Sequence, residues 1–149
     1  MSKAILEKRI DGAFVPLTPE DAEALKRVKI GNGIAIEFKV PRNYQFLKKY
    51  MKLISFAFDN FEPLEGAPEK NFKRFRDDIT ILSGHYIETP RVDGSVRIEA
   101  KSVAFANMEE DEFNVLYDKT CTVLIKFVLK RYTRDDIDRV INKIAEFAA

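Results

Sequence analysis

The sequence predicts an α+β fold in which a small, largely antiparallel sheet packs with about five helices. Short runs that alternate apolar and polar residues are typical of half-buried strands, and longer runs with apolar residues every three or four positions are typical of amphipathic helices. The strands do not alternate regularly with helices, which favours α+β over α/β. The expected order is β-α-β-α-α-β-β-α-α. With 149 residues and 46% apolar content, we expect residues 1–149 to form a single domain.

The first third of the chain is predicted to form strand, helix and strand. Residues 3–10 alternate and end at Asp11-Gly12, a pair that favours a tight turn. Thr18-Pro19 predicts a helix start, because threonine caps and proline suits the first helical position, and this helix should run to about Ile30. Gly31-Asn32-Gly33 can end it. A second strand is then expected over residues 34–40, with alternating Ile34, Ile36, Phe38 and Val40.

Two helices and a hairpin are expected in the middle of the chain. The helix over residues 43–61 has one apolar stripe, made by Phe46, Tyr50, Leu53, Ile54, Ala57 and Phe61. Asn71 can cap a third helix through Leu82, with Phe72, Phe75, Ile79 and Leu82 inward. Residues 85–92 and 95–105 flank Asp93-Gly94, the preferred two-residue type I′ turn. In that register Ile87, Val96, Ile98 and Ala100 lie on one face.

Two further helices are predicted at the C-terminal end. Asn107 with Glu110 is typical of a capped start, and the long helix that follows has a buried stripe of Phe113, Leu116, Tyr117, Thr120, Leu124, Phe127 and Val128. Thr133 opens the last helix, whose inner face holds Ile137, Val140, Ile141, Ile144 and Ala148. Residues 123–129 are apolar almost all round. A helix there is either central or covered by a partner subunit, so we expect a homodimer or higher oligomer.

Positive charge is concentrated in one window of the chain. Residues 26–52 contain one acid, Glu37, and eight basic residues, which gives 8 − 1 = +7: Lys26, Arg27, Lys29, Lys39, Arg42, Lys48, Lys49 and Lys52. The whole chain has 25 basic and 24 acidic residues, so the remainder holds 17 against 23, a net charge of −6. Such a concentrated positive field indicates either a polyanionic partner or a solvated surface.

The helix over residues 43–61 carries part of this charge. Gln45, Lys48, Lys49 and Lys52 recur at helical spacing, so we expect the lysines to share a face. Clustered cations bind phosphates and gain affinity from counterion release, although a solvated helix face is the alternative. Tyr44 could stack on an unpaired base. The candidate nucleic-acid-binding residues are Arg27, Lys39, Arg42, Asn43, Tyr44, Lys48, Lys49 and Lys52.

No complete catalytic or metal-binding set occurs in the sequence. His85, the only histidine, follows Ser83 without a nucleophile elbow, and Cys121, the only cysteine, falls within a predicted helix as a small core residue. One histidine and one cysteine cannot supply the usual metal ligands, and no phosphate-binding glycine pattern is present. We therefore expect no enzyme activity, metal or cofactor. The absence of a disulfide pair, a signal peptide and a long apolar run predicts a cytoplasmic protein without membrane association.

Three motifs and the order of the elements suggest a family. They are RNYQFLKKY over residues 42–50, FRDDITILSGHY over residues 75–86 and KSVAFANMEEDEF over residues 101–113. Over nearly the whole chain they resemble phage and prophage proteins known only as a domain of unknown function. The front half is also similar in arrangement to the NinB (Orf) recombination accessory proteins: strand, capped helix, strand, then an Arg-led helix with basic residues. These proteins bind DNA and help load recombinase onto single strands, so the resemblance implies a non-catalytic mediator in a bacterial host cell.

Two hypotheses of different classes follow. The first is a nucleic-acid-binding recombination accessory that prefers single-stranded DNA and acts through the basic residues. The second is a protein-interaction module that binds and modulates a host or phage protein, with its charged patches as the partner surface. Phosphate contacts make affinity strongly salt-dependent, so a salt titration separates the two hypotheses.

Overall fold

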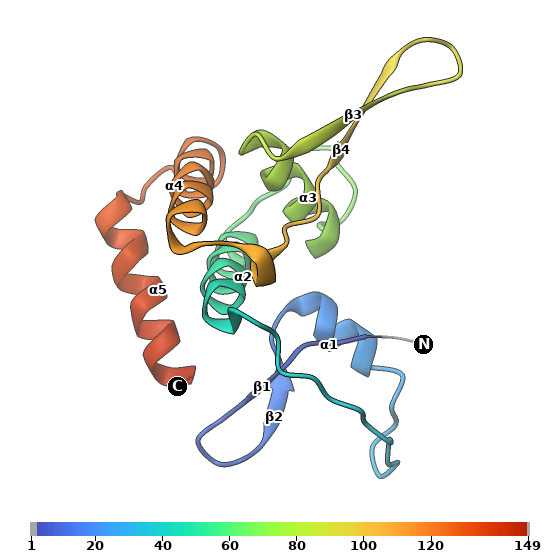
Figure 1. Cartoon of the computed structure of the whole chain (residues 1–149), viewed down its shortest axis with the longest axis vertical. Coiled ribbons are helices and arrows are strands. Elements are labelled where there is room, and N and C mark those ends of the chain that lie inside the picture. Colours follow the sequence, from blue (N-terminus) through green and yellow to red (C-terminus); the bar gives the residue numbers. More distant parts are fainter. Residues whose placement is uncertain (1–2, 149) are drawn as a thin grey trace.

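The computed structural model describes residues 3–148, with side chains described for residues 3–144. Within that range the chain has an α+β fold with five α-helices and two separate antiparallel sheets of two strands each (Figure 1). The elements are β1 (Leu6–Lys8), β2 (Phe14–Pro16), α1 (Pro19–Leu25), α2 (Tyr44–Asp59), α3 (Phe72–Leu82), β3 (Tyr86–Pro90), β4 (Val96–Ala100), the 3₁₀ helix η1 (Phe105–Asn107), α4 (Glu110–Phe127) and α5 (Arg134–Ala148).

Helix α2 lies at the centre and packs against α3, α4 and α5 (Figure 1). Its predicted apolar stripe is confirmed, because Leu53, Ile54 and Ala57 are completely buried. They meet Leu124 of α4 and Ile137 of α5 in the same core. Burying a leucine or isoleucine side chain stabilises a fold by roughly 1.5–3 kcal/mol, so these helix contacts contribute substantially to stability.

The predicted starts of α1, α3 and α5 are confirmed, and at each of them a side chain caps the first turn of the helix. Thr18 Oγ1 accepts from the backbone N–H of Asp21 at 3.1 Å, and the Asp21 carboxylate accepts from the Thr18 N–H at 3.0 Å. Asn71 caps α3 in a similar way, and Thr133 exchanges two hydrogen bonds with Asp136 ahead of α5. The cap expected at Asn107 is wrong, because that residue ends η1 and Glu109 precedes α4.

The strand expected over residues 34–40 is not formed. The partner of β1 is instead β2, which pairs Glu7 with Val15, and α1 ends at Leu25, well before Ile30. Alternation of apolar residues fits a strand only when a neighbouring strand accepts its hydrogen bonds. In the described part of the chain nothing pairs with residues 34–40, and all of them are exposed.

The β3–β4 hairpin is present, but its register differs from the prediction by one residue. Arg91 N donates to Ser95 O at 2.6 Å, so the loop has three residues, 92–94, and not two. Gly94 has φ +87°, whereas Asp93 does not have the positive φ that a type I′ turn requires. A slip of one residue turns a side chain to the opposite face. Ile87 therefore lies opposite Glu99, away from the face of Val96 and Ile98.

The apolar stretch over residues 123–129 is largely covered within the chain. Leu124 and Leu129 are buried, Ile125 is half-buried, and α5 packs alongside α4. Phe127, expected to be inward, is 49% exposed, and Leu82 of α3 is 51% exposed. The stretch itself therefore gives no reason for a partner subunit. On α5, Ile137 and Ile141 are buried as predicted, while the side chain of Ala148 lies outside the described residues.

Candidate nucleic-acid interface

Lys48, a predicted phosphate contact, lies inside the protein. It is 7% exposed, and its Nζ lies 3.5 Å from the Oε1 of Glu7, which is itself 5% exposed. Lys52, one helical turn further along α2, places its Nζ 3.1 Å from the other carboxylate oxygen of Glu7. Two ammonium groups therefore share one buried carboxylate at the contact between β1 and α2. The prediction of one solvent-facing row of lysines is wrong for Lys48.

The reason for this burial is the position of β1. Glu7 comes from the inward face of the short N-terminal hairpin, 41 residues before Lys48 in the chain. A buried carboxylate needs a cation close by because an unpaired charge inside a protein is costly. Lys48 and Lys52 supply that charge, so they hold β1 on α2 and are poorly placed for phosphate.

Lys49 is half-buried and faces α4. Its Nζ lies 4.5 Å from the centre of the Tyr117 ring, and the guanidinium of Arg134 lies 5.3 Å from the same ring centre. A cation over an aromatic face gains stability from the negative charge on that face. Lys49 thus joins α2 to α4, and Arg134 of α5 contacts the same ring; part of the Lys49 side chain is still accessible.

Asn43 and Tyr44 are also used by the fold. Asn43 has a left-handed backbone, φ 54°, and its Nδ2 donates to the carbonyl oxygens of Phe105 at 3.0 Å and Met108 at 3.1 Å. Tyr44 is half-buried against the core, and burial, followed by the nearby charge of Glu7, raises its pKa to about 12. Tyr44 is therefore not the open stacking platform that the sequence suggested.

The remaining candidates lie together on the exposed stretch before α2. Arg27, Lys39 and Arg42 are exposed, as is Lys29, and none of the four forms an ion pair with an acid among residues 3–144. Lys26, by contrast, forms an ion pair with Glu23, with 2.8 Å between Nζ and Oε2. Only Glu37 opposes the four cations within this stretch. We call these four residues, Arg27, Lys29, Lys39 and Arg42, the basic segment.

Phe38 is the residue that sequence reasoning missed. It is 90% exposed and lies next to Lys39, outside any helix or strand. The sequence interpretation placed it in a half-buried strand, so its aromatic face was counted as core. The available signal was the position of Phe38 next to Lys39 within the basic window, because aromatic rings close to cations are typical of surfaces that bind single-stranded nucleic acid.

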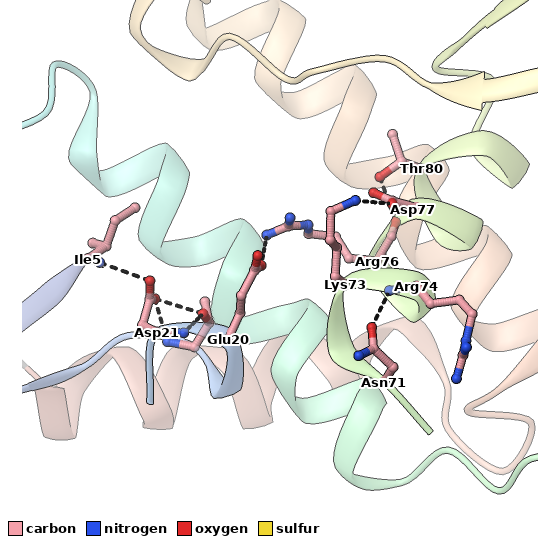
Figure 2. A network of polar contacts seen from close by, with 10 residues as sticks. Ile5, Glu20, Asp21, Asn71, Lys73, Arg74, Arg76, Asp77 and Thr80 are labelled. Carbon is pink, nitrogen blue, oxygen red and sulfur yellow. Dashed lines mark hydrogen bonds and ion pairs between the residues drawn. The ribbon is translucent and has the colours of Figure 1, made fainter. Parts of the chain in front are cut away.

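Both ends of the exposed stretch are anchored. Figure 2 shows the N-terminal anchor. The Arg76 guanidinium of α3 forms an ion pair with the Glu20 carboxylate of α1, with 3.1 Å between Nη1 and Oε2. The Asp21 carboxylate accepts a hydrogen bond from the backbone N–H of Ile5 at 2.9 Å. The C-terminal anchor is the Asn43 side chain described above. Residues 26–42 therefore connect two helices that are each fixed to the rest of the fold.

The residues weighed for chemistry do not form a site. Ser83 is buried and donates to the carbonyl oxygen of Ile79 at 2.7 Å. Cys121 is buried as expected, and burial raises its pKa to about 11. Within residues 3–144 no three His, Cys, Asp or Glu side chains converge to hold a metal ion. No helix in the described range is long and apolar enough to span a membrane.

One cavity of about 340 Å³ lies between α2, α3 and residues 100–105. Its polar lining is largely occupied by the fold: Tyr50 Oη lies 3.5 Å from Thr80 Oγ1, and Thr80 donates to the carbonyl oxygen of Arg76 at 2.7 Å. Of the charged side chains that line it, Arg76 pairs with Glu20 and Asp77 with Lys73, whereas Lys101 forms no ion pair among the described residues. Most of the charge around this cavity is therefore already paired within the fold.

Comparison with known proteins places the chain in a family. A family model described as protein of unknown function (DUF1367) matches residues 1–69 and 67–147, which together cover nearly the whole chain. The two matches meet in the loop between α2 and α3. No curated protein and no solved structure matches the chain significantly. The chain belongs to the DUF1367 family of proteins of unknown function.

Proposed function

We propose that the protein is a non-enzymatic nucleic-acid-binding accessory protein that prefers single-stranded DNA. The observation that carries this proposal is the basic segment: four exposed cations on one anchored stretch, with only Glu37 against them. Exposed lysine and arginine side chains bind phosphates by displacing counterions, with little dependence on sequence. The proposed footprint is therefore Arg27, Lys29, Lys39 and Arg42, without the buried Lys48.

The preference for single strands is supported by Phe38. An exposed aromatic ring beside cations can stack on an unpaired base, and such stacking contributes roughly 1–3 kcal/mol per base. Bases in a duplex are already stacked and offer no free face. The resemblance to NinB (Orf) proteins and to phage proteins adds the wider role: a mediator in phage recombination, acting in the bacterial cytoplasm.

Titration of labelled DNA at several salt concentrations tests this proposal. Four neutralised phosphates predict a slope of about −3 in log affinity against log salt for single strands. The variant Arg27→Glu/Lys29→Glu/Arg42→Glu should lose most of the affinity for all sequences alike. The matched control, Arg91→Glu/Lys119→Glu/Lys130→Glu, makes the same charge change at exposed residues elsewhere and should bind like the wild type. Equal loss in both variants, or no binding by wild type at low salt, would refute the footprint.

The β3–β4 hairpin favours the second candidate function, a protein-interaction module. The hairpin projects from the body of the protein (Figure 1), and one face carries exposed Tyr86, Val96 and Ile98. Apolar side chains on an exposed hairpin can be buried by a partner protein. Binding of a host or phage protein there would persist at high salt, whereas phosphate binding would not.

A further inference from the structure

Residues 34–40, the later part of the exposed stretch, have a strand-like sequence but no strand partner. Residues 34–40 alternate apolar with other side chains and belong to no helix or strand, and Ile36, Phe38 and Val40 are 66%, 90% and 76% exposed. Within the described part of the chain, no backbone hydrogen bond involves residues 34–40. Figure 1 shows this stretch, the teal segment leading into α2, without regular structure. Open backbone groups and apolar side chains together form a template for another strand.

We propose that this stretch pairs with the same stretch of a second copy, as an antiparallel two-stranded ribbon centred on Phe38. Two-fold symmetry about Phe38 places Ile36 opposite Val40 of the second copy and the two Phe38 rings opposite each other. On the other face, Glu37 lies opposite Lys39 of the second copy, and the symmetry produces this ion pair twice. Every cross-strand pair over residues 36–40 is then apolar with apolar or acid with base.

Charge complementarity selects this register over its neighbours. An antiparallel pairing centred on Glu37 places two carboxylates opposite each other, and one centred on Lys39 places two ammonium groups opposite each other. A parallel, in-register pairing also sets like charges side by side. Like charges directly opposite destabilise a sheet, whereas apolar and opposite-charge pairs stabilise it. The sequence Ile36-Glu37-Phe38-Lys39-Val40 is therefore complementary to itself in one register.

The extent of the contact sets the expected strength. Five residues from each copy bury less surface than a standard protein interface, so the dimer should be weak and form only as concentration rises. Pro41 has no N–H to donate, which ends the ribbon next to Val40. The proposed dimer thus rests on a short segment, and the segment 123–129 has no part in it.

The dimer does not depend on the proposed nucleic-acid binding. Arg27, Lys29 and Arg42 lie outside the paired residues, so both copies keep these cations free. Phe38 and Lys39 are the residues used by both proposals. Oligomeric state measured without nucleic acid therefore tests the ribbon alone, and the Arg27, Lys29 and Arg42 variant tests the footprint alone.

Sedimentation over a concentration series, with single and double charge variants, tests the ribbon. Glu37→Lys places lysine opposite Lys39, and Lys39→Glu places glutamate opposite Glu37, so each should weaken self-association by about tenfold or more. The double variant Glu37→Lys/Lys39→Glu restores two opposite-charge pairs and should regain dimerisation. An equimolar mixture of the two single variants should also associate, since every charged pair is then attractive.

A matched control keeps the result specific to the ribbon. Glu62→Lys makes the same charge change in the exposed loop after α2 and should dimerise like the wild type. Circular dichroism checks that each variant is folded. A wild type that stays monomeric at high concentration would overturn the proposal. So would single variants that dimerise normally, or a double variant and a mixture that both fail to recover.

Discussion

Glu7 is the residue through which the N-terminal hairpin forms its ion pairs with α2. Its carboxylate is buried and lies near two ammonium groups, those of Lys48 and Lys52, yet it accepts no hydrogen bond among the described residues. Such a group is held by charge alone. Lys48 is itself buried, whereas Lys52 is partly exposed, so removing the carboxylate leaves Lys48 buried without a partner.

We predict that Glu7→Ala lowers the free energy of unfolding by about 3 kcal/mol. The reason is that the substitution leaves the Lys48 ammonium group buried with no opposite charge to offset its loss of hydration. Lys26→Ala, which breaks the exposed pair with Glu23, is the control and should change stability little. Urea unfolding at neutral pH measures both. Equal effects of the two substitutions would show that the Glu7 contact behaves as a surface pair.

Cys121 allows a second test at the scale of one residue. Burial raises its pKa from 9.0 to about 11, so the thiol stays protonated at neutral pH, and only the thiolate reacts rapidly. We predict slow labelling of the folded protein by a thiol reagent at pH 8 and fast labelling in concentrated urea. As pH rises, the thiol of the unfolded protein ionises at a lower pH than the buried thiol, which favours unfolding. The stability that the buried thiol contributes is therefore lost between about pH 9 and about pH 11. Rapid labelling of the folded protein would contradict this placement.

Among the elements, those with local signals were predictable from sequence. Thr18, Asn71 and Thr133 cap their helices through neighbouring residues, and the spacing of Leu53, Ile54 and Ala57 identifies the buried face of α2. The hairpin location was also predictable, but its register depended on whether the loop has two residues or three. In the structure, Asp93 Oδ1 accepts from the Ser95 N–H at 3.0 Å within the three-residue loop.

The hairpin loop provides a prediction at this scale. Gly94 has φ +87°, so Gly94→Ala should cost about 1 kcal/mol of hairpin stability, because an L side chain disfavours that backbone. No atom lies within 4 Å of the added Cβ, so the cost comes from the backbone alone. Gly33→Ala is the control, since Gly33 has open space and no positive φ. Hydrogen exchange of the β3 and β4 amides should accelerate in the first variant only.

At the scale of the whole molecule, the candidate site was predicted only in part. The charge window was correct as a region, but the sequence could not show that Glu7 would meet Lys48 across 41 residues. Nor could it show that the Asn43 side chain would donate hydrogen bonds to the carbonyl oxygens of Phe105 and Met108, just before α4. Helical spacing places side chains on a face, whereas the distant segment that covers the face depends on the assembled fold. Arg27, Lys39 and Arg42 remained exposed because nothing packs over them.

The Asn43 contact has a consequence for the order of folding. Its partners, the carbonyl groups of Phe105 and Met108, lie 62 and 65 residues later in the chain. At a synthesis rate of roughly 5–20 residues per second, the ribosome takes several seconds to deliver them. Until then one anchor of residues 26–42 is missing. Ile36, Phe38 and Val40 are exposed in the finished fold and leave the ribosome well before it is complete, so neighbouring chains on one polysome are where the proposed ribbon would first form.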